Sequence, residues 1–400
     1  MGNKSLTRVS IFLISQIISL FGSAIVSYTI IWYITLKTSS TMALAMSVVF
    51  TYMPQIVISV FSGTLGDRFN KKYLIIIGDT ITGVSTLILA VLFINGFRSL
   101  YLIYAACALR SAGAGIQTPL ENAFLPLICP EEKLTKVNGI YATASSAINI
   151  LSPAMAGILL NMMDFGYTLM VDCVTALLAV VVLYRMKYKN TIDLEKESVD
   201  ILTDFVVGVK YFKQHVFLGR LIIFYLLFYF FMSAPAFLTP VLVNIKFSNS
   251  VNALAINEFV WSMGTMLGGL LICLLKESNK LRLMAFSSVL FGGFICLLGA
   301  SENFAIYIFF MLCSGMSLPI FNTSNIVLVQ ENVKKEMLGR TFANLNILST
   351  ISTTIGITVF GLMGDVISVD ILLVLVGVFI ALLSIWVWKL YREYGNYKVT

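Results

Sequence analysis

The sequence predicts an all-α integral membrane protein with twelve transmembrane helices in two pseudo-symmetric six-helix bundles. Hydrophobic residues make up 58% of the 400 residues and charged residues only 12%. A soluble chain of this length could not bury so much apolar surface in its own core, because ordinary soluble domains carry about twice that share of charge. The apolar runs lack the period-two alternation of a transmembrane barrel, so helices must satisfy the backbone polar groups in lipid.

Twelve apolar runs have the length that a membrane-spanning helix needs, roughly 20 residues. We place them at 9–35, 42–66, 73–95, 99–121, 137–162, 165–186, 217–243, 252–275, 283–300, 304–328, 341–364 and 369–390. The first run is too long for a signal peptide and lacks a small-residue cleavage site, so it counts as a span.

The basic residues predict the orientation. If the N-terminus is cytoplasmic, all but four of the 27 Lys and Arg residues lie on the inner side, and the exceptions are Lys37, Arg98, Lys246 and Arg110. This bias predicts an even number of spans with both termini in the cytoplasm. The net charge of +7 then reflects insertion beside anionic headgroups, and no nucleic-acid partner is expected.

A polar stretch after the sixth span divides the chain. We expect an N-terminal bundle at 1–190, a cytoplasmic linker at 191–216 and a C-terminal bundle at 217–400. Ile201, Phe205, Val209 and Phe212 share one face at helical spacing, which predicts an amphipathic segment on the inner membrane surface. The halves resemble each other at an offset of about 203 residues, at which Asn122 falls on Asn325. Paired six-helix halves suit a transporter that works by alternating access.

The segment between spans two and three reads Gly-Thr-Leu-Gly-Asp-Arg-Phe-Asn-Lys-Lys. Its notable residues are Gly63, Gly66, Asp67, Arg68, Asn70, Lys71 and Lys72. The glycines permit close helix approach, and Asp67 can accept hydrogen bonds from a helix N-terminus or pair with a cation. Lys71 and Lys72 are expected to anchor the segment at the inner surface. An ordinary positive-inside turn is the alternative reading.

Spans four and five carry residues that are unusual inside a membrane helix: an arginine and a proline. Arg110 lies within span four, ahead of Gly113 and Gly115, and a charge there must face an acid, a carbonyl or a wet cavity. A purely structural ion pair is an alternative role for it. Pro153 in span five, followed by Gly157, removes one helical hydrogen bond and predicts a bend.

These motifs resemble those of the major facilitator superfamily, and specifically its macrolide-efflux group in Gram-positive bacteria. The resemblance rests first on the segment from Gly63 to Lys72, on Arg110 with its glycines, and on the Pro153 motif, which is similar to one in exporters. Three further matches support it: the Pro130–Gly139 segment, Gly78 with Asp79, and Glu258 with the glycine run 264–269. It covers nearly the whole chain and implies a drug/proton antiporter in the cytoplasmic membrane of a bacterium. Asn70 stands where the family usually has glycine.

Few acids lie within the predicted spans. Glu258 lies about two turns from the outer end of span eight, and a carboxyl in an apolar environment favours its protonated form. We assign proton coupling or recognition of substrate charge to Glu258, Arg110 and Asp172. A carboxyl that is merely hydrogen-bonded between helices is the alternative for Glu258, and a packing role is expected for Asp79.

A cavity for a large amphipathic drug should be apolar and aromatic with few polar groups. The candidates sit in spans that approach the centre by family resemblance: Gln16, Tyr28, Gln117, Asn149, Tyr225, Tyr229, Trp261, Asn322 and Asn346. Packing or lipid contact is the alternative for each. No metal ligand set, cofactor motif or phosphate-binding loop is recognisable, and His215 is the only histidine, so an enzyme is not expected.

The leading hypothesis is a secondary exporter of amphipathic antibiotics, macrolides foremost, in exchange for protons. The expected partners are the drug, protons and the lipid bilayer, and a monomer is expected because two halves complete a transport unit. Export of an endogenous siderophore, peptide or other metabolite is a second hypothesis. A solute-sensing protein on a transporter fold is a third.

Overall fold

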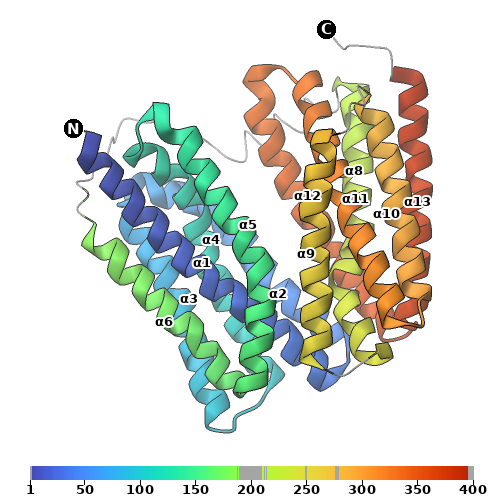
Figure 1. The fold of residues 1–400 in the computed structure, drawn as a ribbon. Coiled ribbons are helices and arrows are strands. Elements are labelled where there is room, and N and C mark those ends of the chain that lie inside the picture. Colours follow the sequence, from blue (N-terminus) through green and yellow to red (C-terminus); the bar gives the residue numbers. More distant parts are fainter. Residues whose placement is uncertain are drawn as a thin grey trace. The chain divides into compact units, whose positions relative to one another are not determined.

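The computed structural model describes residues 2–186, 188, 210, 212, 214–247, 250–274 and 279–394. Within this part of the chain, twelve long α-helices and one short π-helix occur and no strand is found, which confirms the predicted all-α membrane fold (Figure 1). Eleven of the helices contain a stretch long and apolar enough to cross a membrane. The exception is α4 (Leu100–Ile128), whose apolar run is interrupted by Arg110 and Gln117.

The chain forms two compact units, Met1–Lys37 with Met46–Ser198, and Thr38–Ala45 with Val199–Thr400. The first unit is built from the helices coloured blue to green in Figure 1. Besides α4, these are α1 (Gly2–Thr38), α2 (Thr41–Arg68), α3 (Lys71–Ile94), α5 (Glu131–Met162) and α6 (Phe165–Arg185).

The second unit contains the helices coloured from yellow-green to red. They are α8 (Val216–Leu242), the π-helix η1 (Val243–Phe247), α9 (Val251–Leu274), α10 (Lys280–Ala300), α11 (Phe304–Asn332), α12 (Lys335–Gly364) and α13 (Val369–Tyr394). Most of the predicted linker 191–216, with Ile201, Phe205 and Val209 of its amphipathic face, lies outside the described residues.

Several helices are longer than the apolar runs that predicted them. The segment from Gly63 to Arg68 forms the end of α2, so only Phe69 and Asn70 make the turn before α3. Likewise, α5 begins at Glu131 rather than near 137, and α12 begins at Lys335 rather than near 341. Hydropathy marks the part of a helix that lies in hydrocarbon, but polar residues can continue its hydrogen-bond ladder into water.

Corresponding helices of the two halves begin and end at matching positions. A shift of about 204 residues places α4 on α11, and the same shift places α5 and α6 on α12 and α13 to within a few residues. The sequence similarity between the halves is therefore accompanied by the same helix lengths.

Each unit has its own apolar core. In the first unit α3 packs against α4 and α6, and Phe12, Ile75 and Phe124 belong to one buried cluster. In the second, Phe228 stacks on Phe321 with ring centroids 3.7 Å apart. Many large apolar side chains remain exposed, including Ile88 and Leu177. Lipid is the environment in which such a surface is stable.

The turn between α1 and α2 packs with the second unit, where Asp365 binds the start of α2. The Oδ1 atom of Asp365 accepts hydrogen bonds from the Thr41 backbone N–H at 2.8 Å and from the Thr41 hydroxyl at 2.7 Å. The Ser40 hydroxyl donates to Oδ2 at 3.0 Å. Partial burial raises the pKa of Asp365, but the hydrogen bonds from Thr41, Ser40 and the Met42 N–H outweigh it and hold that pKa below its ordinary value. The carboxylate therefore caps a helix N-terminus, where negative charge is favoured.

Asp365→Ala should lower the stability of the purified protein by about 0.5–1 kcal/mol, a cap contribution reduced by solvent exposure. Asp365→Asn is the matched control, because its amide oxygen still accepts hydrogen bonds, and it should lose less. Because the pKa of Asp365 is depressed in the fold, its contribution is present at neutral pH and is lost as the pH falls below about 4. Thermal unfolding in detergent at several pH values measures this. Equal unfolding temperatures for the wild type and Asp365→Ala at pH 7 would contradict it.

Candidate functional site

A buried ion pair lies at the centre of the first unit. Arg110 on α4 contacts Asp172 on α6 through its Nη1 atom and also donates to the Thr86 hydroxyl on α3. Thr86 donates in turn to Asp172 Oδ2 at 2.8 Å, and the Ser23 hydroxyl on α1 donates to Asp172 Oδ1 at 3.0 Å. Both carboxylate oxygens therefore have donors, and one of the donors is a cation. Two of the predicted coupling residues are thus each other's partner.

A second polar cluster surrounds Asp79 on α3. Its Oδ1 atom accepts a hydrogen bond from Ser19 of α1 at 2.5 Å and another from Gln117 Nε2 of α4 at 3.0 Å. Gln117 Nε2 also donates to Gln16 Oε1 at 3.1 Å. The structure thus brings two predicted cavity residues, Gln16 and Gln117, to a carboxyl group that we expected only to pack.

The same cluster continues to a second carboxyl group. Glu121 lies one helical turn after Gln117, and its carboxyl group interacts with Gln117 and with Tyr141 of α5. Among the described residues, no partner is found for Asp79 Oδ2 or for Gln16 Nε2, although both atoms are buried.

Close packing of α3 on α4 holds these clusters together. A Cβ atom at Gly113 would lie 2.6 Å from the Gly78 carbonyl oxygen and 2.6 Å from the Thr82 hydroxyl oxygen. Both distances are too short for a side chain, so the glycine after Arg110 is what allows the two backbones to approach.

The basic pair at the start of α3 binds helix ends. Lys71 Nζ donates to the Gly66 carbonyl at 2.6 Å, near the end of α2. Lys72 is buried and donates to the Tyr184 and Met186 carbonyls at 2.9 and 2.7 Å, where α6 ends. Asn70 caps α3, because its side chain accepts the Lys72 N–H. The Lys72 ammonium therefore satisfies orphan carbonyls of α6.

In the second unit, Glu258 on α9 has only neutral hydrogen-bond partners among the described residues. Asn257 Nδ2 donates to Glu258 Oε1 at 3.2 Å, and the Tyr307 hydroxyl of α11 donates to Asn257 Oδ1 at 2.7 Å. Asn257 and Tyr307 are completely buried, whereas Glu258 is partly exposed. Glu258 thus presents a carboxyl group backed by a rigid polar pair.

Three predicted cavity residues meet between α8 and α11. Tyr225 and Tyr229 lie with ring centroids 4.6 Å apart, and the Tyr229 hydroxyl donates to Asn322 Oδ1 at 3.1 Å. Tyr225 also stacks on Phe321 at 6.3 Å. This aromatic cluster, with one amide and two hydroxyls, has the mixed chemistry expected of an amphipathic-drug site.

The remaining predicted residues do not join these clusters. Tyr28 lies beside Trp32 at 5.9 Å, and Trp261 packs edge-on against Phe291 at 6.4 Å. The side chains of Asn149 and Asn346 are exposed. Pro153 and Gly157 are buried, and α5 continues through both, so the predicted bend stays a prediction. Asp67 and Gly63 lie in the last turns of α2.

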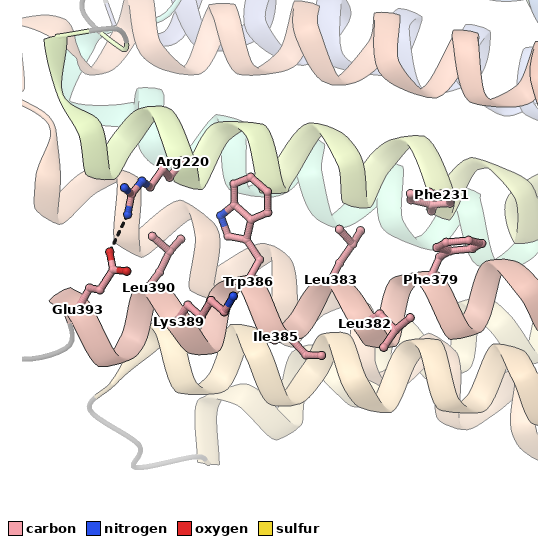
Figure 2. Close-up of a pocket in the computed structure, with 10 residues that line it drawn as sticks. All are labelled: Arg220, Phe231, Phe379, Leu382, Leu383, Ile385, Trp386, Lys389, Leu390 and Glu393. Carbon is pink, nitrogen blue, oxygen red and sulfur yellow. Dashed lines mark hydrogen bonds and ion pairs between the residues drawn. The ribbon is translucent and has the colours of Figure 1, made fainter.

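A groove of about 440 Å³ lies between α8 and α13, and none of the predicted cavity residues lines it (Figure 2). Phe231 and Phe379 stack at one end, and Arg220 pairs with Glu393 at 2.6 Å at the other. Most of its lining is aliphatic or aromatic, and it is too open to enclose a solute. We do not place the transport site there.

Residues 12–357 match the sequence model of the Major Facilitator Superfamily. The chain belongs to this superfamily. It is a multi-pass transporter of the bacterial cell membrane and not an enzyme. Solved structures with the same fold include the nucleoside transporter NupG, with a TM-score of 0.73 at 14% identity over 98% of this chain and 100% of that one. A peptide-transporter-family (POT) structure in complex with 5-aminolevulinic acid has a TM-score of 0.75 at 11% identity, covering 96% of both chains.

Curated relatives confirm the resemblance to the macrolide-efflux group. Macrolide efflux protein A of Streptococcus pyogenes is 27% identical over 92% of both chains. The protein of the same name from Enterococcus faecalis is 25% identical, over 80% of this chain and 99% of that one. The staphyloferrin A transporter of Staphylococcus aureus is 26% identical over 72% of both chains.

Several residues of the site were missed from the sequence. Ser19 and Ser23 bind the two buried aspartates, and together with Gln16 they are spaced by three and four residues along α1. That spacing puts them on one helix face, so a polar stripe was a readable signal. Tyr141 and Tyr307 left no such signal, because their partners lie on other helices.

Arg110→Ala and Asp172→Ala should each destabilise the protein by about 3–5 kcal/mol, because each leaves a buried charge without its partner. The double variant should lose clearly less than the sum of the two. Thermal unfolding and membrane expression measure all three. Additive losses would show that the two side chains do not interact.

Gly113→Ala should destabilise the protein by about 1–3 kcal/mol, because its methyl group would force α3 and α4 apart. Gly139→Ala on α5 is the matched control, since a Cβ there meets nothing within 4 Å. Unfolding temperatures compare the two variants. An unaffected Gly113→Ala protein would contradict the close approach of the helices.

Proposed function

We propose that this transporter exports amphipathic antibiotics, macrolides foremost, in exchange for protons by alternating access. The observation that carries the proposal is the similarity to macrolide efflux protein A along 92% of the chain. The distribution of polar groups supports it.

The second unit offers surfaces for a bulky amphipathic solute. Tyr225, Tyr229 and Asn322 combine aromatic faces with a few hydrogen-bonding groups, which is how drug sites obtain both affinity and tolerance. Glu258 adds a carboxyl group with no described cationic partner, able to attract a protonated amine or to exchange a proton.

A proton gradient supplies enough free energy for resistance. One charge crossing a potential of ~150 mV gains roughly 3.5 kcal/mol, which supports a solute gradient of about 300-fold. Exchange for one proton would therefore keep the cytoplasmic drug concentration low without ATP.

Export of a siderophore is the second candidate, and the similarity to the staphyloferrin A transporter favours it. The two candidates differ in what competes for transport. An excess of siderophore should block drug export only if both use one site. A solute-sensing role predicts no sustained transport of either compound.

Cells of a drug-sensitive host that express the protein should accumulate less labelled erythromycin than cells with an empty vector, and an uncoupler should abolish the difference. The Glu258→Gln variant should export the drug at a rate at least tenfold lower than wild type. This corresponds to a barrier higher by about 1.4 kcal/mol or more in the transport step. Glu302→Gln is the matched control, because its carboxylate is 86% exposed and pairs with Lys246. Equal accumulation in wild-type and vector cells, with the protein present in the membrane, would refute macrolide export.

A further inference from the structure

We infer that Asp79, Gln117 and Glu121 form a proton-binding site in the first unit, with the proton carried on Asp79 Oδ2. The site's role in export rests on the proposed proton coupling, but its protonation does not. None of the predicted coupling residues belongs to this cluster.

The hydrogen bonds of Asp79 all fall on one of its two carboxyl oxygens. Its Oδ1 atom accepts from Ser19 and from Gln117, whereas its Oδ2 atom has no donor among the described residues. An ionised carboxylate has two equivalent oxygens that both attract donors, but a neutral acid has one carbonyl oxygen and one hydroxyl. Asp79 is 1% exposed, so it is shielded from bulk water.

Asp172 shows the opposite pattern in the same unit. It is completely buried, yet Ser23 donates to one of its oxygens and Thr86 and Arg110 donate to the other. Such a carboxylate is stabilised as an anion by its cation and donors. The two buried aspartates therefore differ in their surroundings: Asp172 has donors on both oxygens, one of them cationic, whereas Asp79 has neutral donors on one oxygen alone.

Among the described residues of the helices packed around Asp79, every nearby cation is held by other groups. The nearby titratable or charged groups are Glu121 and Arg110 on α4, Asp172 on α6, Tyr141 on α5 and Lys72 on α3 itself, while α1 contributes the neutral Gln16 and Ser19. Arg110 is held by Asp172 and Thr86. The Lys72 ammonium is held by two carbonyls at the end of α6. The other groups beside Asp79 are negative or neutral, and such surroundings favour the protonated form of its carboxyl group.

Glu121 gives this site a route for protons. It lies one helical turn from Gln117 toward the end of α4 at Ile128, and it is partly exposed whereas Asp79 is not. A hydronium that protonates the Glu121 carboxylate forms an O–H bond there and leaves water, which places an exchangeable proton one helical turn from the Gln117 that binds Asp79. The reverse transfer releases the proton to water, and no electron moves.

Infrared spectroscopy of the purified protein tests the protonation directly, because a carboxylic acid has a C=O stretching band that a carboxylate lacks. Wild type at pH 7 should show this band, and Asp79→Asn should remove the component that belongs to Asp79, seen in the wild-type-minus-variant difference spectrum. Glu302→Gln, the exposed control, should leave it unchanged. Ser19→Ala keeps the acid and removes one donor to Oδ1, so it should shift the band to higher frequency, and it serves as the probe if Asp79→Asn does not fold.

A wild-type spectrum without the band at pH 7 would overturn the inference, and so would a band that neither Asp79→Asn nor Ser19→Ala alters. Proteoliposomes separate this site from the proposed function. If the Asp79 band is present but drug export proceeds without proton flux, proton coupling fails and the site stands. If drug-driven proton flux occurs while Asp79 lacks the band, coupling stands and the site fails.

Discussion

The ion pair between Arg110 and Asp172 joins groups from four helices at one buried point of the first unit. Hydrocarbon offers no water to a charged side chain, so the pair and its two hydroxyl partners must be complete within the protein. The requirement extends to the backbone. The glycines at the α3–α4 contact allow the two backbones to approach closely enough for these side chains to meet. At the end of α6, the Lys72 ammonium donates the hydrogen bonds to backbone carbonyls that water would otherwise supply.

The two units satisfy the same requirement with different chemistry. At the position that corresponds to Arg110, the second unit has Cys313, and its buried polar contacts run through neutral groups such as Tyr307 and Asn257. Its core is dominated by stacked aromatic rings. The first unit is thus rich in charge networks and the second in aromatic surface.

The contrast between Asp79 and Asp172 shows why a membrane carboxyl cannot be assigned from its position alone. Both lie within predicted spans, and both are buried. From the sequence, Asp172 was one of three coupling candidates, with Glu258 and Arg110, and Asp79 was expected to pack. The hydrogen-bond partners of the two aspartates motivate the proton site inferred at Asp79, because Asp79 has only neutral partners whereas Asp172 pairs with a guanidinium.

Composition and hydropathy predicted the twelve helices and placed most of their apolar parts correctly, because burial in lipid imposes a length and a polarity on each span. They placed the ends of α2, α5 and α12 too early or too late. Hydropathy marks only the part of a helix that lies in hydrocarbon, and polar residues can continue the same helix into water. The motifs predicted the superfamily, because a charged arginine inside a span is costly in lipid and because its spacing from the glycines and the proline resembles the pattern of that family.

Which side chains meet was decided by the tertiary structure. Gln16 with Gln117, Tyr229 with Asn322 and Ser40 with Asp365 are separated by 101, 93 and 325 residues. Pairing between residues so far apart in the sequence depends on the rotation of each helix about its axis and on distances of a few ångströms between helices. The sequence by itself determined that a few polar groups had to be satisfied inside a membrane bundle. Only helix packing decided their partners, because a hydrogen bond acts over about 3 Å and hydropathy carries no information at that scale.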